Sequence, residues 1–235
     1  MKSTSRSDWY EPGLALKLVA LDNEMTHVDE TDSNYADFAS DYDTEVRAYC
    51  SYLHDCIFGM SYKAVSPGEK LLDIGIGTGL ASETFNKAGL RITGIDNSPE
   101  MLEVCKKKQI AEALTSCDLS HGQLPFENRT FHHVICCGVL HFFGELAELF
   151  RETSRIVKPG GTFAFSIMPD DNQAGDYQKE ISDWDIPIYK HKPEYISQLL
   201  TENSFEQLKE QRLLTKDFHK RHYTLMFSVI VCRQK

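Results

Sequence analysis

The stretch LLDIGIGTGLA, residues 71–81, joins an apolar run to a glycine-rich loop and then to a helix-compatible segment. The apolar run ends at Asp73, and glycines follow at the alternate positions Gly75, Gly77 and Gly79. Glycine has no Cβ, so a loop of this kind lets the backbone approach a ligand closely. The stretch therefore predicts a ligand-binding loop after a buried strand, and related loops hold a nicotinamide dinucleotide, the phosphates of ATP or an adenosyl sulfonium.

Short apolar strands alternate with helices along the rest of the chain. We expect strands at residues 70–74, 91–95, 113–117, 132–138, 162–167, 205–214 and 223–234, and helices at 80–89, 99–108, 144–157 and 193–204. Ser98 and Pro99 supply a start signal, as an N-cap and a first helical residue. This alternation is typical of a mostly parallel sheet with helices on both faces.

Length and composition predict a single domain. A chain of 235 residues is long enough for one full core and marginal for two. Residues 1–34 are expected to form a polar arm, and residues 35–235 the domain. Within the domain, residues 35–66 are expected to form a helical cap, and residues 169–192 a polar, aromatic-rich insertion on the substrate side.

Charge and cysteine content argue against several classes of function. The formal net charge is −10, which is unfavourable for a nucleic-acid partner. The basic run at residues 106–108 is expected to complement the dipole at a helix end. No apolar run approaches the ~18 residues of a membrane span, and no secretory signal is evident. The seven cysteines contain no C-x-x-C pair, so we expect reduced thiols and a cytoplasmic location.

The spacing of the glycine loop narrows the choice of ligand. A Walker A loop would need Lys after Gly79, where Leu80 stands. A dinucleotide loop starting at Gly75 would need a small residue at position 80, so that the helix packs close to the pyrophosphate. The acid at Asp73 is poorly placed for a pyrophosphate and well placed for a cationic ligand.

Four stretches in order resemble the motifs of one enzyme family. LLDIGIGTGLA resembles motif I of the class I S-adenosylmethionine-dependent methyltransferases. GIDNSPEML (94–102) resembles the second motif of this family. CDL (117–119), with the strand that follows it, resembles the region of the third and fourth strands, and RIVKPGGTFAFS (155–166) resembles the turn and the fifth strand. Within the class the chain resembles the type 11 subgroup. YADFASDYDTEV (35–46), taken with this core, resembles the methyltransferase-like proteins of the Williams–Beuren region.

This resemblance implies a fold and an activity. The fold would be Rossmann-like and doubly wound, with a mostly parallel seven-stranded sheet, an antiparallel last strand and an N-terminal helical cap. The cofactor would be S-adenosyl-L-methionine, and the acceptor a small molecule to which the methyl group passes in line. The protein would be a monomer or homodimer with no nucleic-acid or membrane partner.

The resemblance also assigns roles to residues around the loop. Gly75 and Gly77 would admit the amino-acid tail and the ribose, and Asp73 would face the ammonium group. Asp96, at the end of the second strand, would accept hydrogen bonds from the ribose hydroxyls, a role that NAD sites share. Asn97 would flank the adenine. For Asp73 the alternative is an acid that caps the next helix.

Further contacts are expected from outside the loop. Met101 would flank the adenine, Asp118 would accept from its amino group, and the Leu119 N–H would bind a ring nitrogen. The alternatives are core packing for Met101 and an Asx turn for Asp118. The remaining candidates are Cys137 and Gly138, through their backbone, and Tyr35 and Tyr42, which would close over the ligand or only pack the cap onto the sheet.

The sequence contains no obvious catalytic base or metal cluster. His132, His133, Cys136 and Cys137 alternate between the two faces of a strand, which leaves no four-ligand site. The resemblance would place His141 near the transferred methyl group, as a base or as a structural residue. Candidates for the acceptor pocket are Tyr177, Trp184, Tyr189 and His191. A dinucleotide-dependent oxidoreductase and a non-catalytic protein of the same fold remain the rival hypotheses.

Overall fold

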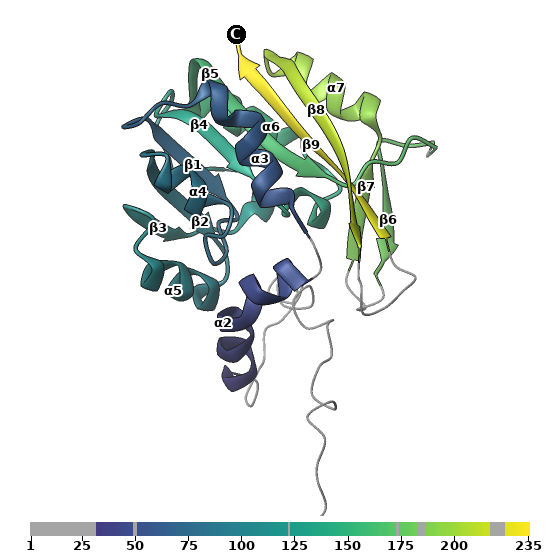
Figure 1. The fold of residues 1–235 in the computed structure, drawn as a ribbon. Helices are drawn as coiled ribbons and strands as arrows, with labels where there is room; N and C mark the ends of the chain where they lie inside the picture. The colour runs from purple at the N-terminus through teal and green to yellow at the C-terminus, as the bar shows by residue number, and fades with distance from the viewer. Residues whose placement is uncertain (1–31, 49–50, 122, 173, 183–186, 217–223) are drawn as a thin grey trace, which may run out of the picture.

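The structure is a computed structural model that describes residues 32–48, 51–121, 123–172, 174–182, 187–216 and 224–235 (Figure 1). The predicted polar arm lies outside these ranges, except for its last three residues, which begin the helix α2 (Asp32–Ala48). Trp184 also lies outside them. Within the described part of the chain, no helix is long and apolar enough to cross a membrane.

Seven strands of the described chain form one sheet in the order β3-β2-β1-β4-β5-β9-β8. β1 to β5 run parallel, and β9 is antiparallel to both of its neighbours, β5 and β8. The predicted doubly wound sheet with an antiparallel last strand is therefore confirmed. The strands are β1 (Lys70–Ile74), β2 (Arg91–Asp96), β3 (Ala113–Ser116), β4 (Phe131–Cys136), β5 (Val157–Ile167), β8 (Phe205–Lys216) and β9 (Thr224–Gln234).

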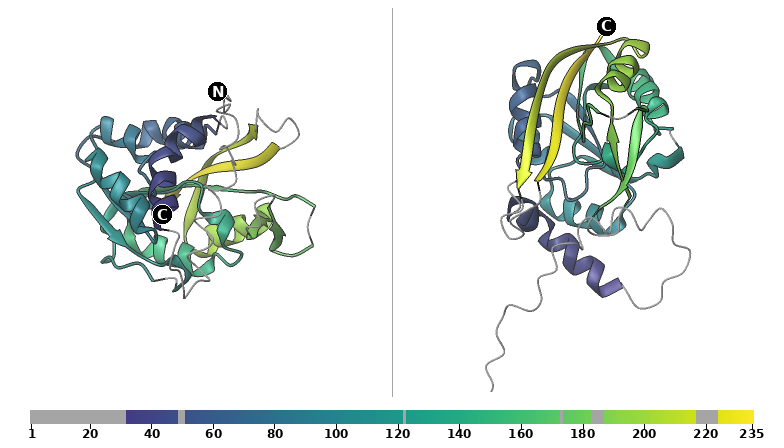
Figure 2. Two further views of the ribbon diagram at one scale, coloured as in Figure 1. Left: turned by 90° about the horizontal axis from the view of Figure 1, so that it is seen from below. Right: turned by 90° about the vertical axis from the view of Figure 1, so that its right-hand side faces the viewer.

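Helices cover both faces of the sheet (Figure 2). α6 and α7 enclose one core around Phe150, and α3 and α4 enclose the other around Phe85. β1 serves both cores, because successive side chains point to opposite faces: Leu72 lies in the first core and Leu71 in the second. The helices are α3 (Leu53–Ser61), α4 (Ser82–Lys87), α5 (Pro99–Lys108), α6 (Ala147–Ile156) and α7 (Pro193–Glu202).

The start of α5 follows the sequence signal. The Ser98 hydroxyl accepts a hydrogen bond from the Met101 N–H at 3.3 Å, and Pro99 is the first helical residue. The basic run at residues 106–108 ends this helix as expected. Lys108, however, also forms ion pairs with Asp43 of α2 and Glu83 of α4, so its charge does more than complement the helix dipole.

Two stretches differ from the elements expected from the sequence. The insertion at residues 169–192 contains a hairpin of β6 (Tyr177–Ile181) and β7 (Pro187–His191), where no strand was predicted. β5 begins at Val157 instead of residue 162, because its register with β4 shifts between Phe131 and His133. This irregular start absorbs Gly160, whose φ is 79°.

We predict that Ser98→Ala lowers the free energy of unfolding by about 1 kcal/mol, because the substitution removes the side-chain acceptor at the N-cap of α5. Urea unfolding followed by circular dichroism measures this change. Ser98→Thr, which keeps a hydroxyl, is the matched control and is expected to unfold nearly as the wild type does. Equal losses in both variants would contradict the capping role.

Candidate active site

The carboxyl ends of the central strands bring the predicted site residues to one edge of the sheet. Asp73 in β1 lies between Gly94 of β2 and Ile135 of β4 in the strand register. β2 ends at Asp96, and Cys137 follows the end of β4. Because parallel strands present their carboxyl ends at the same edge, Asp73, Asp96 and Cys137 converge where ligands of such sheets bind.

Asp73 is a buried carboxylate with one satisfied oxygen. The residue is 1% exposed, and its Oδ2 accepts a hydrogen bond from the Ser82 hydroxyl at 2.8 Å. Oδ1 has no hydrogen-bond partner among the described residues. The pKa of Asp73 is raised to about 7, mainly by burial. The hydrogen bond from Ser82 lowers this pKa, and the nearby carboxylate of Asp96 raises it. Asp73 does not cap α4, because its partner is the Ser82 hydroxyl and α4 has no side-chain cap, and Oδ1 remains available to a cation.

Gly75 and Gly77 differ in what surrounds them. Both have positive φ, 70° and 51°. A Cβ built on Gly75 would lie 2.3 Å from Cγ2 of Val139, in the segment after β4, whereas a Cβ on Gly77 would meet nothing within 4 Å. Gly75 is therefore required by the packing of the chain itself. Gly77 borders open space, as a loop that receives a ligand must.

Asp96 fixes the shape of the glycine loop. Oδ2 accepts from the Gly77 N–H at 2.7 Å, and Oδ1 accepts from the Ser98 N–H at 3.0 Å. Burial raises the pKa of Asp96, and these backbone hydrogen bonds oppose that shift. Asn97 follows directly and is half-buried. The acid therefore ties the end of β2 to the glycine loop.

The helical cap meets the site through α2. Met101 is 4% exposed and packs with Ala39, Val104 and Tyr42. Its side chain therefore contacts α2, which agrees with the alternative that Met101 serves in packing. Burial raises the pKa of Tyr42 above its usual value, and nearby Cys137, Asp43 and Asp96 raise it further. The Tyr42 hydroxyl thus lies near the ends of β2 and β4. The backbone of Tyr35 belongs to α2, but its side chain lies outside the described residues.

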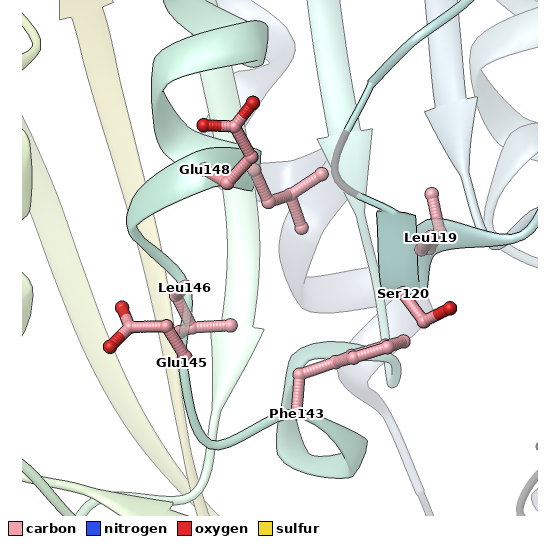
Figure 3. Close-up of a pocket in the computed structure, with 7 residues that line it drawn as sticks. Leu119, Ser120, Phe143, Glu145, Leu146 and Glu148 are labelled. Carbon is pink, nitrogen blue, oxygen red and sulfur yellow. The ribbon is translucent and has the colours of Figure 1, made fainter.

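Asp118 and Leu119 lie on a short turn after β3. Asp118 is exposed, and its Oδ1 accepts from the Ser120 N–H at 2.8 Å, which is the Asx turn of the alternative interpretation. Leu119 and Ser120 line one side of a pocket of about 180 Å³. Figure 3 shows Glu145, Leu146 and Glu148 on its other side, with both carboxylates directed away from Leu119. This volume is small for a nucleoside ligand, and no residue of the glycine loop lines it.

The segment after β4 is built around neutral groups. Cys137 is half-buried, and burial raises the pKa of its thiol. The Gly138 N–H donates to the Ser166 hydroxyl at 2.8 Å, so it is already engaged. Burial, with His191 nearby, lowers the pKa of His141 to about 3, and His141 Nδ1 has no partner in the described chain. His141 packs against Phe142, with ring centroids 4.1 Å apart.

The hairpin β6–β7 gathers three of the predicted acceptor-side residues. Tyr177 and Tyr189 lie on one face, with ring centroids 5.8 Å apart, and Tyr177 is paired with His191 in the register. His191 is fully buried, donates from Nε2 to the Phe143 carbonyl at 2.9 Å, and stacks on Tyr195. His191 is therefore a structural support, whereas Tyr177, 39% exposed, is open to a ligand.

The histidine pair at the start of β4 is engaged by the protein. His133 Nδ1 lies 2.8 Å from the Thr162 hydroxyl and Nε2 lies 2.8 Å from Glu69. His132 Nδ1 accepts from the Lys70 N–H at 3.0 Å. Over the described ranges, no group of three or more His, Cys, Asp and Glu side chains is arranged to hold a metal ion.

Several residues of the site are not visible in the sequence pattern. Val139 fills the space that Gly75 leaves, and Ser166 of β5 holds Gly138. A Cβ on Gly144 would lie 2.5 Å from the Tyr177 ring, so that glycine lets the hairpin approach the segment after β4. Asp43 of α2 accepts a hydrogen bond from Thr78 in the glycine loop. In the sequence, the only sign of the pair formed by Asp43 and Thr78 is the acid that follows Tyr42 in YADFASDYDTEV.

Comparisons with known proteins agree with this geometry. The family described as "Methyltransferase domain" matches residues 72–165. A demethylmenaquinone methyltransferase of Tropheryma whipplei is 32% identical over 97 residues, which are 41% of this chain and 41% of that protein. A malonyl-[acyl-carrier protein] O-methyltransferase of Serratia marcescens is 32% identical over 102 residues, 43% of this chain and 39% of that protein. The chain thus aligns with about two-fifths of the length of these relatives.

A solved structure extends the likeness of the fold to most of the chain. The 1,6-didemethyltoxoflavin-N1-methyltransferase of Burkholderia thailandensis, solved with S-adenosylhomocysteine bound, superposes with a TM-score of 0.63. The match is 17% identical and covers 90% of this chain and 93% of that one. At this identity the likeness concerns the fold, and it agrees with the sheet order described above.

We predict that the stability of the ligand-free protein falls as the pH rises from about 4 to about 7, relative to Asp73→Asn. An unfolded aspartate titrates near 4, whereas folded Asp73 titrates near 7. The protonated form is therefore favoured by folding, and its contribution is present at low pH and lost as the pH rises through 7, by on the order of 4 kcal/mol. Urea unfolding of both proteins at pH 5 and pH 8 should show about 3 kcal/mol of this difference, and parallel pH profiles would contradict it.

We further predict that Gly75→Ala is more destabilising than Gly77→Ala. Both changes place a side chain at positive φ, but only the first also drives a Cβ into Val139, so we expect a loss of about 2–4 kcal/mol against about 1 kcal/mol. Thermal unfolding ranks the two variants. Val139→Ala added to Gly75→Ala should restore part of the loss, and no restoration would show that the clash is not the cause.

Proposed function

We propose, from the match of residues 72–165 to the methyltransferase domain family, that the chain is a class I, type 11 enzyme that transfers a methyl group from S-adenosyl-L-methionine to a small-molecule acceptor. The observation that carries the proposal is the buried Asp73 carboxylate, whose Oδ1 has no partner among the described residues. A buried acceptor of this kind is costly unless a donor reaches it. The ammonium group of the cofactor is such a donor.

The residues around the glycine loop fit the three parts of this cofactor. Asp73 would bind the ammonium group, and the open space beside Gly77 would admit the tail and ribose. Asp96 would accept from the ribose hydroxyls with the lone pairs that Gly77 and Ser98 leave free. We assign Asn97, Met101, Asp118, Leu119 and the Cys137 backbone to the adenine and tail as proposals, with Tyr35 and Tyr42 above them.

When bound, S-adenosylmethionine supplies a methyl group that the positive charge on sulfur already activates. The tasks left to the chain are to orient the acceptor and to exclude water. Cys56, Phe142 and Cys137 pack against one apolar core and would help to keep water from the reacting groups. A general base is needed only if the acceptor must lose a proton, and we assign no residue to that role.

We propose that the hairpin β6–β7 forms the acceptor side of the site. This proposal is supported by the packing of β7 against the short helix Leu140–Phe142, which follows β4. Tyr177 and Tyr189 would offer aromatic faces to a small acceptor. The relatives named above act on demethylmenaquinone and on malonyl-[acyl-carrier protein], which supports this substrate class without naming the acceptor. A cytoplasmic location and a monomeric or dimeric state stay predictions.

Calorimetric titration of the full chain with S-adenosylmethionine, S-adenosylhomocysteine and NADH tests the cofactor. We expect saturable binding of the first two and none of NADH. Binding of NADH alone would favour the oxidoreductase hypothesis. A folded protein that binds all of them weakly or not at all would contradict the proposal, and turnover of any acceptor would exclude the non-catalytic alternative.

Asp73→Asn separates binding from folding. The variant should bind S-adenosylhomocysteine about 10- to 100-fold more weakly, because it loses a hydrogen bond between charged groups. The same variant should be more stable than the wild type at pH 8, since the buried charge is gone. Glu112→Gln removes an exposed ion pair with Arg91 far from the cleft and is the matched control. Undiminished affinity in Asp73→Asn would refute the role of this carboxylate.

A further inference from the structure

Among the side chains of helix α2 that the structure describes, from Ala39 onward, apolar contact with the rest of the domain is limited. It lies beside α5 at the carboxyl-end edge of the sheet, apart from the two main cores (Figure 1). The apolar part of the contact is formed by Ala39 of α2 and Met101 of α5, both buried, with Tyr42 and Val104 at its border. Two buried side chains of this size contribute little compared with the cores that hold the other helices.

The polar part of the contact centres on Asp43, beside a longer ion pair of 3.9 Å between Arg47 of α2 and Glu83 of α4. Asp43 Oδ1 accepts a hydrogen bond from the Thr78 hydroxyl at 2.5 Å, and its Oδ2 forms an ion pair with Lys108 of α5. Lys108 also lies 3.1 Å from Glu83, in the first turn of α4. The side chains of Asp43 and Lys108 are 17% and 21% exposed, so water and salt screen this pair much less than a surface pair.

Thr78 connects this contact to the glycine loop. The residue stands between Gly77 and Gly79 and is 1% exposed, so its hydroxyl is directed by the fold and not by solvent. Its neighbour Gly77 donates its N–H to Asp96 and borders the open space of the cleft. Asp43 therefore holds α2 against the glycine loop.

The position of Tyr42 indicates that α2 lies close to the carboxyl ends of β2 and β4. The side chain is half-buried, and its hydroxyl lies near Cys137 and Asp96, at the ends of β4 and β2. Together with the hydrogen bond from Thr78 to Asp43, this places α2 over the side of the glycine loop that faces these strand ends.

We propose that Asp43, Thr78 and Lys108 form a latch that keeps α2 closed over the glycine loop and sets the rate at which the cofactor is released. The inference rests on the proposed function, because it takes S-adenosylmethionine as the ligand of the loop. Asp43 and Thr78 act as positioning residues and touch neither the methyl group nor the acceptor.

The first test follows release of S-adenosylhomocysteine from the full-length protein by stopped-flow displacement. Asp43→Ala and Thr78→Val should each release it about tenfold faster than the wild type, in keeping with the loss of a hydrogen bond to a charged group. Association should become faster too, so that the dissociation constant changes much less than the release rate. Thr78→Ser, which retains the donor, should behave as the wild type, and the Glu112→Gln control should not differ from it.

A double-mutant comparison shows whether the two residues act together. Because Asp43 and Thr78 share one hydrogen bond, the double variant should release ligand no faster than the faster single variant. Multiplied effects would overturn the latch. So would release rates in Asp43→Ala and Thr78→Val equal to that of the wild type.

The second test needs no ligand. Hydrogen exchange of the α2 amides in the free protein should be faster in Asp43→Ala and unchanged in Glu112→Gln, while the amides of β1 and β4 stay protected in both. Unchanged exchange in α2 would overturn the latch. If the folded wild type binds no S-adenosylhomocysteine, both the proposed function and the latch fail. If the wild type binds it and the variants release it at the same rate as the wild type, only the latch fails.

Discussion

The burial of Asp73 is the constraint around which the site is arranged. The carboxylate stands in the central strand, between β2 and β4, where water cannot solvate it. The fold satisfies one oxygen through Ser82 and leaves the other unpartnered in the described chain, and the pKa of about 7 expresses that cost. A side chain that lowers the stability of the empty fold is best understood as one selected for a ligand.

The sequence predicts those features that depend on neighbouring residues. The apolar run that ends at Asp73 predicts β1, and Ser98 with Pro99 predicts the start of α5, because strand burial and helix capping act over a few positions. The order of strands and helices then limits the topology to a few parallel arrangements. Asp73 and Asp96 are found in this way, since the ends of adjacent parallel strands must meet at one edge.

The features that the sequence does not predict join residues that are distant along the chain. Nothing near Gly75 indicates that Val139 fills the space beside it, and nothing near Lys108 indicates that Asp43 will pair with it. The hairpin β6–β7 is missed for a related reason. β6 is almost wholly exposed and carries Gln178 and Glu180, so the apolar alternation that marks a buried strand is absent from it.

The charges around the glycine loop discriminate between the rival cofactors. Burial raises the pKa of Cys105, beneath the loop, and the carboxylates of Asp73, Asp96 and Asp43 raise it further, while Lys108 alone opposes them. A pyrophosphate bound here would face this excess of negative charge, and Leu80 is buried where a dinucleotide loop needs a small residue. S-adenosylmethionine carries a net positive charge and would be attracted. Transfer of its methyl group removes the sulfonium charge, so the same carboxylates would hold the product less strongly than the substrate.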